Sequence, residues 1–195
     1  MEWKKKEYNQ NGKLLFENEY LNGKLWNGKG KEYDYDGKLI FEGEYLNGLR
    51  KNGKEYNEDK NKVIIFEGEY LNGMKLKGKE YNENRMVIFE GDYLNGIRWN
   101  GKEKDYDNNG DIKLEVEIIN GKGKGKEYRF KELIYEGEFL NGKRHGKGKQ
   151  FWNNKLKFEG EFLNGKRNGK GKEYDYNGEV VFEGEYLDGK RLNQK

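Results

Sequence analysis

The stretch Leu39-Ile40-Phe41-Glu42-Gly43-Glu44-Tyr45-Leu46-Asn47-Gly48 decides the fold. In an extended strand its positions 39, 41, 43 and 45 share one face, while Glu42 and Glu44 share the other. Helical spacing would scatter these side chains around an axis. Asn47-Gly48 tolerates the positive φ angles of a hairpin turn, so we expect the chain to reverse there. The stretch therefore predicts one strand of a β-hairpin.

The same phrase, Phe/Tyr-Glu-Gly-Glu-Tyr/Phe-Leu-Asn-Gly, recurs along nearly the whole chain, which marks a repeat protein. Copies begin at Phe16, Phe41, Phe66, Phe89, Tyr135, Phe158 and Phe182. Asn18 replaces the glycine of the first copy. A degenerate copy begins at Leu114, where Val116 and Ile118 replace the glycine and the second aromatic residue. We expect the groove of the array to bend or break at these two copies.

A second phrase separates the copies, and its best example is Gly-Lys-Gly-Lys-Glu-Tyr-Asp-Tyr-Asn-Gly at residues 169–178. Each repeat thus holds two strand-length pieces. The sequence predicts an all-β fold: an elongated, single-layer antiparallel meander of about eight stacked β-hairpins. We expect one array over residues 1–195, with a half-repeat at 1–15 and copies from 16, 41, 66, 89, 114, 135, 158 and 182.

The two faces of the predicted sheet differ in chemistry. Glycine between two aromatic residues leaves room for a ring from a neighbouring strand. On the opposite face, rows of glutamate would lie beside rows of lysine, and each such cross-strand pair contributes roughly 0.2 to 1 kcal/mol. Because one hairpin is marginal alone, we expect stability to be shared between neighbouring copies.

Composition excludes several kinds of chemistry. The chain has 38% charged and 32% hydrophobic residues, yet 15% are aromatic, which argues against disorder. It contains no Cys, Ser or Thr and one histidine, His145. Nucleophiles of the serine, threonine or cysteine hydrolase kind and multi-histidine metal sites are therefore excluded, and the repetition of every Glu pair argues against catalysis. We expect no enzyme activity, no cofactor and no metal.

The segment from Tyr135 to Gly148 resembles the MORN repeat (membrane occupation and recognition nexus). The resemblance covers nearly the whole chain. It implies a single-layer twisted antiparallel sheet of hairpins. It also implies a scaffold, a membrane-associated adaptor or a helix-binding groove.

Two surfaces are candidate partner sites. The first is an aromatic groove that accepts a helix or peptide; the alternative is that these rings pack only against each other. Its residues are Tyr20, Tyr45, Tyr70, Tyr93, Phe139, Phe162 and Tyr186. The second is a row of apolar loop residues after the early Asn-Gly pairs; the alternative is that they fold over the sheet end and shield it. Its residues are Leu25, Trp26, Leu49, Met74, Leu76, Ile97 and Trp99.

The later loops carry basic residues at the same positions, a weaker candidate for binding anionic lipid headgroups. These residues are Lys143, Arg144, Lys166, Arg167, Lys190 and Arg191. Nucleic acid is disfavoured, because alternating glutamates oppose phosphate in every copy. Residues 105–112 match the start of an EF-hand loop, but Val116 stands where a bidentate Glu is required, so a simple turn is expected.

The sequence predicts a non-enzymatic scaffold that binds a helix or peptide segment of a protein partner. One alternative is a peripheral membrane adaptor, and another is an antitoxin or immunity protein that binds a toxin. We expect a cytoplasmic location, with a peripheral position at a membrane as a variant, since no apolar stretch approaches the roughly 20 residues of a spanning helix. Open sheet edges would also allow a homodimer.

Overall fold

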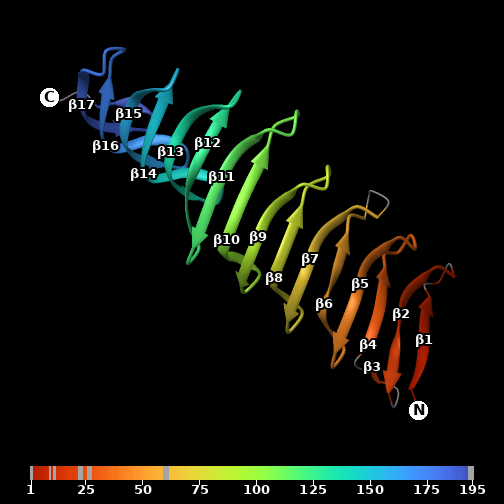
Figure 1. The fold of residues 1–195 in the computed structure, drawn as a ribbon. Coiled ribbons are helices and arrows are strands. Elements are labelled where there is room, and N and C mark those ends of the chain that lie inside the picture. The colour runs from red at the N-terminus through yellow and green to blue at the C-terminus, as the bar shows by residue number, and fades with distance from the viewer. Residues whose placement is uncertain are drawn as a thin grey trace. The chain divides into compact units, whose positions relative to one another are not determined.

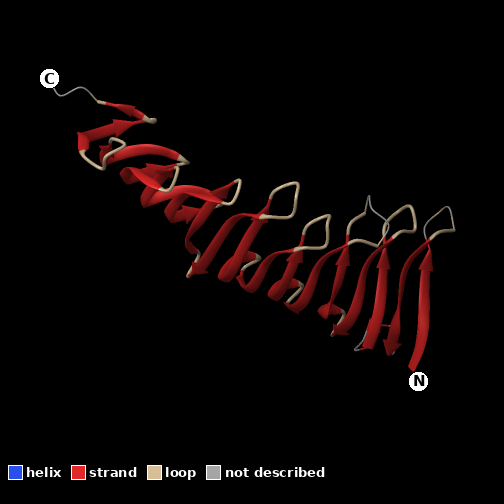
Figure 2. Cartoon of the chain, turned by 45° about the horizontal axis from the view of Figure 1, so that its top comes forward, coloured by secondary structure: helices blue, strands red, loops and turns tan. Residues whose placement is uncertain are grey.

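The computed structural model describes residues 2–8, 10, 12–21, 24–25, 28–58 and 62–192. The chain divides into two compact units, Met1–Arg98 and Trp99–Lys195. In each unit the described residues form strands joined by tight turns, which follow one another in chain order (Figures 1 and 2). The expectation of one continuous array over 1–195 stays a prediction.

The first unit is an antiparallel meander in which each strand pairs with its neighbours in sequence. Strand β2 pairs with the two-residue β3 and with β4. The strands are β1 (Glu2–Tyr8), β2 (Leu14–Leu21), β3 (Lys24–Leu25), β4 (Gly28–Tyr33), β5 (Leu39–Leu46), β6 (Leu49–Tyr56), β7 (Ile64–Leu71), β8 (Met74–Tyr81) and β9 (Val87–Leu94).

The second unit repeats this arrangement, and its first strand, β10, begins two residues before the unit boundary. The strands are β10 (Ile97–Tyr106), β11 (Ile112–Ile119), β12 (Lys122–Arg129), β13 (Glu132–Leu140), β14 (Lys143–Trp152), β15 (Lys155–Leu163), β16 (Lys166–Tyr174), β17 (Val180–Leu187) and β18 (Lys190–Arg191). The predicted fold class, an all-β antiparallel meander of hairpins, is confirmed. No helix with the length and apolar character of a membrane span occurs in the described part of the chain.

Asn-Gly pairs close the hairpins, as expected. Asn47 and Gly48 have φ angles of 51° and 79°, and Asn72 and Gly73 have 52° and 78°. Positive φ at both central residues is the geometry that matches the twist of paired strands. The last copy uses Asp188 at the same position, with a φ of 49°.

A row of glycines runs across the sheet of each unit and makes room for the core. Gly43 of β5 lies opposite Gly53 of β6, and the row continues through Gly68 and Gly78 in the next hairpin. A Cβ on Gly53 would lie 2.5 Å from Cζ of Phe41. The ring of Phe41 therefore lies over the backbone of Gly53, and a side chain at position 53 would exclude the ring.

The rings form one continuous row within each unit. Phe41 makes T-shaped contacts with Tyr45 of its own hairpin at 5.6 Å and with Tyr70 of the next at 5.7 Å between centroids. The second unit repeats the pattern, with Tyr135 against Phe139 and Phe162. Such edge-to-face pairs add to the energy of burial. Each copy thus completes the core of its neighbour.

Sheet pairing continues through the degenerate copy. Strand β11 pairs with β10 and with β12, and Val116 and Ile118 are buried in place of the glycine and the ring. The β11–β12 hairpin lacks the register shift near the turn that the β5–β6 and β13–β14 hairpins show. The expected break thus affects the row of rings, whereas the hydrogen-bonded ladder stays intact.

Candidate functional site

Among the described side chains, a cation covers each ring that starts a phrase. Cζ of Arg50 lies 4.2 Å from the centroid of Phe41, and Nζ of Lys75 lies at the same distance from Phe66. In the second unit the same contacts join Arg144 to Tyr135, Arg167 to Phe158 and Arg191 to Phe182, at 4.7, 4.2 and 4.6 Å. Cations over ring faces are attracted by the ring quadrupole. The chain's own basic side chains therefore cover the outer face of the ring row.

Carboxylates of the preceding repeat and of the cation's own strand hold these cations in place. Arg50 donates to Glu32 through Nε at 2.9 Å and Nη2 at 2.6 Å, and its Nη1 donates to Glu55 at 3.1 Å. The hydroxyl of Tyr45 donates to the same Glu32 carboxylate at 2.7 Å. Burial opposes ionisation of Glu32, but the hydrogen bonds from Arg50 and Tyr45 outweigh it, so its pKa is lowered.

The predicted aromatic groove is filled by this arrangement. Its described side chains are all buried, with exposed fractions of at most 6%. They are Tyr45, Tyr70, Tyr93, Phe139, Phe162 and Tyr186. The side chain of Tyr20 lies outside the described residues. These rings contact each other and the covering cations, which matches the alternative that they pack as a core; a partner on this face would have to displace the cations.

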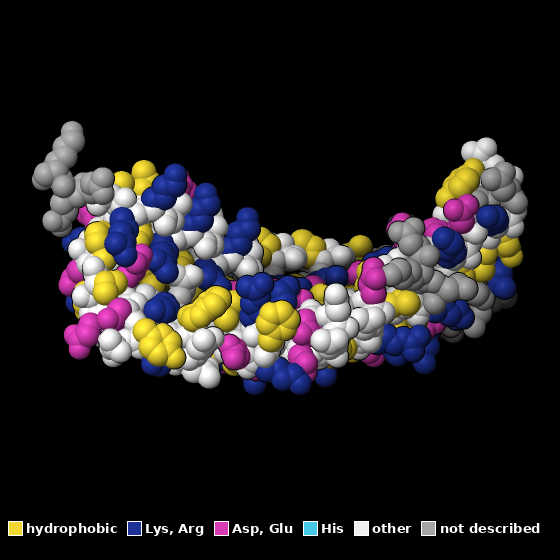
Figure 3. Space-filling model, turned by 90° about the horizontal axis from the view of Figure 1, so that it is seen from above, with side chains coloured by type: hydrophobic (Ala, Val, Ile, Leu, Met, Phe, Trp, Pro, Cys, Tyr) yellow, Lys and Arg dark blue, Asp and Glu magenta, His cyan; other side chains and the backbone are white. Residues whose placement is uncertain are grey.

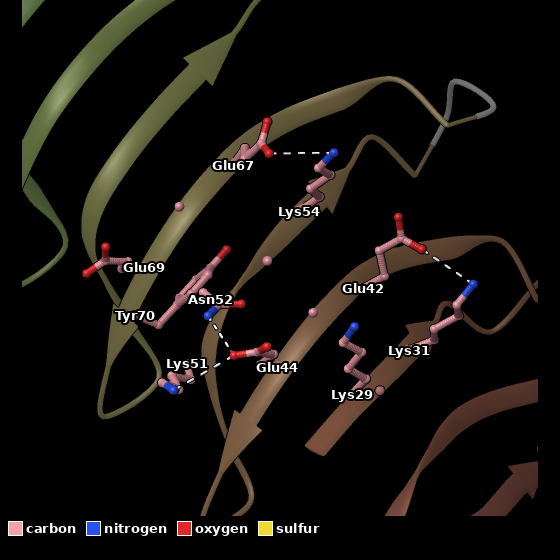
Figure 4. A pocket seen from close by; sticks show the side chains of 14 residues that line it. Lys29, Lys31, Glu42, Glu44, Lys51, Asn52, Lys54, Glu67, Glu69 and Tyr70 are labelled. Atoms are coloured by element: carbon pink, nitrogen blue, oxygen red, sulfur yellow. Dashed lines mark hydrogen bonds and ion pairs between the residues drawn. The ribbon is translucent and has the colours of Figure 1, made fainter. Parts of the chain in front are cut away.

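The opposite face carries the expected lysine and glutamate rows. In the first unit they line an open hollow of about 1180 Å³ (Figure 4). Lys31 pairs with Glu42 at 3.4 Å, and Lys54 pairs with Glu67 at 3.5 Å. The second unit has a corresponding hollow of about 1240 Å³ lined by the equivalent lysines and glutamates. The charges alternate strand by strand and nearly cancel.

The described members of the predicted apolar loop row in the first unit are exposed. Leu49, Met74, Leu76 and Ile97 have exposed fractions of 47%, 48%, 38% and 68%. The shielding alternative is therefore not seen for these four. Trp26 and the side chain of Leu25 lie outside the described residues. Trp99 belongs to the second unit, where its ring lies beside Gly121 of the next turn.

Sequence reasoning missed the leucines that end the phrases, which extend this row. Leu46 lies directly opposite Leu49, and Leu71 lies opposite Met74. Leu46, Leu71 and Leu94 are all about half exposed. We call the seven residues together the apolar edge: Leu46, Leu49, Leu71, Met74, Leu76, Leu94 and Ile97. Leu46 continues the alternation of Glu42 and Glu44, so the sequence did contain the signal.

The predicted basic loops split into two kinds of residue. Arg144, Arg167 and Arg191 lie over rings. Arg144 and Arg191 pair with Glu127 and Glu173, each two strands earlier in the meander, and Arg167 pairs with Glu173 of its own strand. Lys143, Lys166 and Lys190 are exposed and lie opposite exposed leucines at the hairpin ends. Lys166 approaches Asp188 at 3.4 Å. Lipid binding at these residues stays a prediction.

The acidic segment at 105–112 forms a turn, as expected. Oδ1 of Asp107 accepts hydrogen bonds from the backbone N–H groups of Asn109 and Asp111 at 2.8 and 3.0 Å. Across the described residues no group of three or more His, Cys, Asp or Glu side chains is arranged to hold a metal ion. The carboxylate is thus used to fix the turn.

Fold and surface together define a β-hairpin repeat protein whose core is shared between copies and whose free surfaces are turn edges and a charged face. Residues 135–157 and 158–180 each match the family model of the MORN repeat. Residues 135–180 are therefore two MORN repeats, and the resemblance read from Tyr135 to Gly148 is confirmed there. No curated protein matches the chain.

Proposed function

We propose that the protein is a non-enzymatic scaffold that binds an amphipathic helix of a partner protein along the apolar edge of the first unit. The observation that carries this proposal is a row of seven exposed apolar side chains at consecutive hairpin ends. Contiguous exposed apolar surface on a folded protein marks an interaction site more often than chance exposure does.

The spacing of this edge suits a helix. Equivalent residues recur every second strand, or roughly every 9.6 Å at an interstrand spacing of about 4.8 Å. A helix repeats its side-chain positions every seven residues, or roughly 10.5 Å. From β5 to β10 the edge extends roughly 24 Å, so a helix of about four to five turns would cover it. The Lys and Glu side chains of the adjoining face would then meet the polar flank of that helix.

Site-specific crosslinking in lysate of the source organism tests this proposal. The full chain carries a photo-reactive amino acid at Ile97, and a matched control carries it at Leu163, an exposed residue that ends a phrase in the second unit. We expect Ile97, and not Leu163, to crosslink to one amphipathic helical segment. A synthetic peptide of that segment should lose at least tenfold in affinity for the double variant Met74→Glu, Ile97→Glu. Equal affinity for this variant and for Leu163→Glu would contradict the proposal.

A second function is favoured by the hairpin ends of the second unit. There Leu140, Leu163 and Leu187 each lie opposite an exposed lysine, which combines apolar contact with positive charge. This pattern suits the surface of an anionic membrane. At low salt the protein should sediment with phosphatidylserine vesicles. The triple variant Lys143→Gln, Lys166→Gln, Lys190→Gln should stay in the supernatant. Equal retention on uncharged vesicles would refute this role.

Partners of the toxin class and edge-mediated dimers stay predictions.

A further inference from the structure

One strand of the second unit departs from the repeat at a position that faces the ring row. Gln150 of β14 lies opposite both Tyr135 and Phe158, where the equivalent residues in the neighbouring strands are Glu127 and Glu173. Arg50 is held between two carboxylates, but Arg167 is held between the amide of Gln150, at 2.7 Å, and Glu173, at 2.6 Å. One negative charge is therefore missing from this site.

The missing charge leaves a positive hollow of about 620 Å³, which we call the cationic hollow. Its lining includes the four cations Arg129, Arg144, Lys157 and Arg167 and a single carboxylate, Glu173. Glu173 is shared between Arg167 and Arg191. A volume of this size lies within the range of roughly 300–1,000 Å³ that is usual for small-molecule sites.

Hydrogen-bond donors in the cationic hollow outnumber acceptors. Within the described residues, the side chains of Arg129 and Lys157 make no ion pair and lie near ring faces. Arg144 uses Nε for Glu127 at 2.8 Å, which leaves its two Nη groups as donors. Because Oε1 of Gln150 accepts from Arg167, its amide nitrogen adds two further donors. A site rich in donors and poor in acceptors selects an oxyanion.

An aromatic platform lies beside these donors. Trp152, at the end of β14, lines the hollow and is 61% exposed, and Phe151 and Ile134 line it as well. Phe130, in the neighbouring turn, is 85% exposed. Figure 3 looks onto this turn edge, and at its left large hydrophobic side chains lie next to lysine and arginine side chains. A planar ring stacked on such a side chain is stabilised by the contact between the two ring faces.

We propose that the cationic hollow binds a small organic phosphate, with the phosphate between Arg129, Arg144 and the Gln150 amide and a planar body against Trp152. A phosphate monoester fits better than a carboxylate, because its charge approaches two and it offers three terminal oxygens to the excess of donors. Guanidinium groups match these oxygens in pairs. This site is separate from the apolar edge, so it can fail without affecting the proposed scaffold function.

Calorimetric titration of the full chain with AMP tests the proposal, with inorganic phosphate and adenosine as partial probes. We expect saturable 1:1 binding of AMP, at least tenfold tighter than that of either partial probe. Gln150→Glu should weaken AMP binding at least tenfold. This variant restores the glutamate of the other repeats, so it should fold at least as well as the parent. Trp152→Ala should weaken AMP binding but leave inorganic phosphate unchanged.

The matched control is Asn141→Asp, which adds the same single negative charge in a turn where Asp188 shows that aspartate fits. It should bind AMP as the parent does. AMP binding that Gln150→Glu leaves unchanged, or no saturable AMP binding, would overturn the proposal. Vesicles of phosphatidylcholine with phosphatidic acid form the last arm. The protein could bind these vesicles, lose that binding in Gln150→Glu and not bind AMP. This result would assign the phosphate to a lipid and overturn the assignment to a free, ring-bearing ligand.

Discussion

At the scale of single residues, the glycine row decides whether the rings can be buried. Gly53 shows this, because a Cβ there would meet both the ring of Phe41 and the backbone oxygen of Glu42. Backbone atoms on the opposite strand have little freedom to move away. The sequence pattern predicted space for a ring at these glycines. The structure shows that glycines of two paired strands provide the space for one ring.

Gly53→Ala should therefore destabilise the protein by roughly 1–3 kcal/mol, the usual cost of overpacking a core. The measurement is chemical unfolding followed by tryptophan fluorescence. Lys54→Ala is the matched control, since Lys54 is on the other face and pairs with Glu67 at 3.5 Å in solvent. Exposed pairs contribute at most about 1 kcal/mol. A loss for Gly53→Ala no larger than that of Lys54→Ala would show that the ring can shift at little cost.

The arginines over the rings could not be predicted from the pattern. Arg50 reaches the face of Phe41 because the β5–β6 register shifts between Glu44 and Tyr45, which brings Tyr45 opposite Arg50. A strict alternation of side chains gives no sign of such a bulge. Arg144 and Arg167 are half-buried for this reason, whereas Arg191 and the three loop lysines are exposed.

At the scale of elements, each hairpin depends on a two-residue turn with positive φ angles. The alternation of side chains and the Asn-Gly pairs were enough to predict the strands and these turns. They could not predict the regular β11–β12 hairpin, where Gly123 lies opposite Ile118 and no arginine follows the turn. Its strand β12 has eight residues, as β6 and β8 have, so the difference lies in the pairing register, which only the structure shows.

Gly73→Ala should open the β7–β8 hairpin. Gly73 has a φ of +78°, and the left-handed conformation costs an alanine about 1–2 kcal/mol. Hydrogen exchange should show faster exchange at the β7 and β8 amides and an unchanged rate in the second unit. Asn72→Asp is the control, because Asp188 adopts the same conformation in the last copy. Uniform acceleration along the whole chain would instead indicate global destabilisation.

At the scale of the whole molecule, the half-buried carboxylates make stability depend on pH. Burial raises the pKa of Glu80, but the hydrogen bond and charge of Arg98 outweigh it, and the result is a lowered pKa. The pKa of Glu32 is lowered in the same way by Arg50 and Tyr45. Below the ordinary value of 4.5 the unfolded chain therefore binds more protons than the folded chain, so stability falls as the pH decreases.

The unfolding temperature should thus be nearly constant at neutral pH and decrease below about pH 4.5. Glu80→Gln should reduce the difference in unfolding free energy between neutral pH and about pH 3, because one of the linked groups is gone. Glu58→Gln, at an exposed turn, is the control. An identical pH profile for Glu80→Gln and the parent would show that the Arg98 pair does not survive in solution.

Within each unit, the pairing of strands that are close in sequence has a consequence for the speed of folding. All-β proteins usually fold slowly, because distant segments must meet before their contacts stabilise anything. Here each strand meets a partner that lies a short turn away, and each new hairpin adds rings to a row already begun by the preceding one. Folding can start at any hairpin and extend outward, so this β-protein should fold with the rapid kinetics of chains whose contacts are local, even while it is still being synthesised.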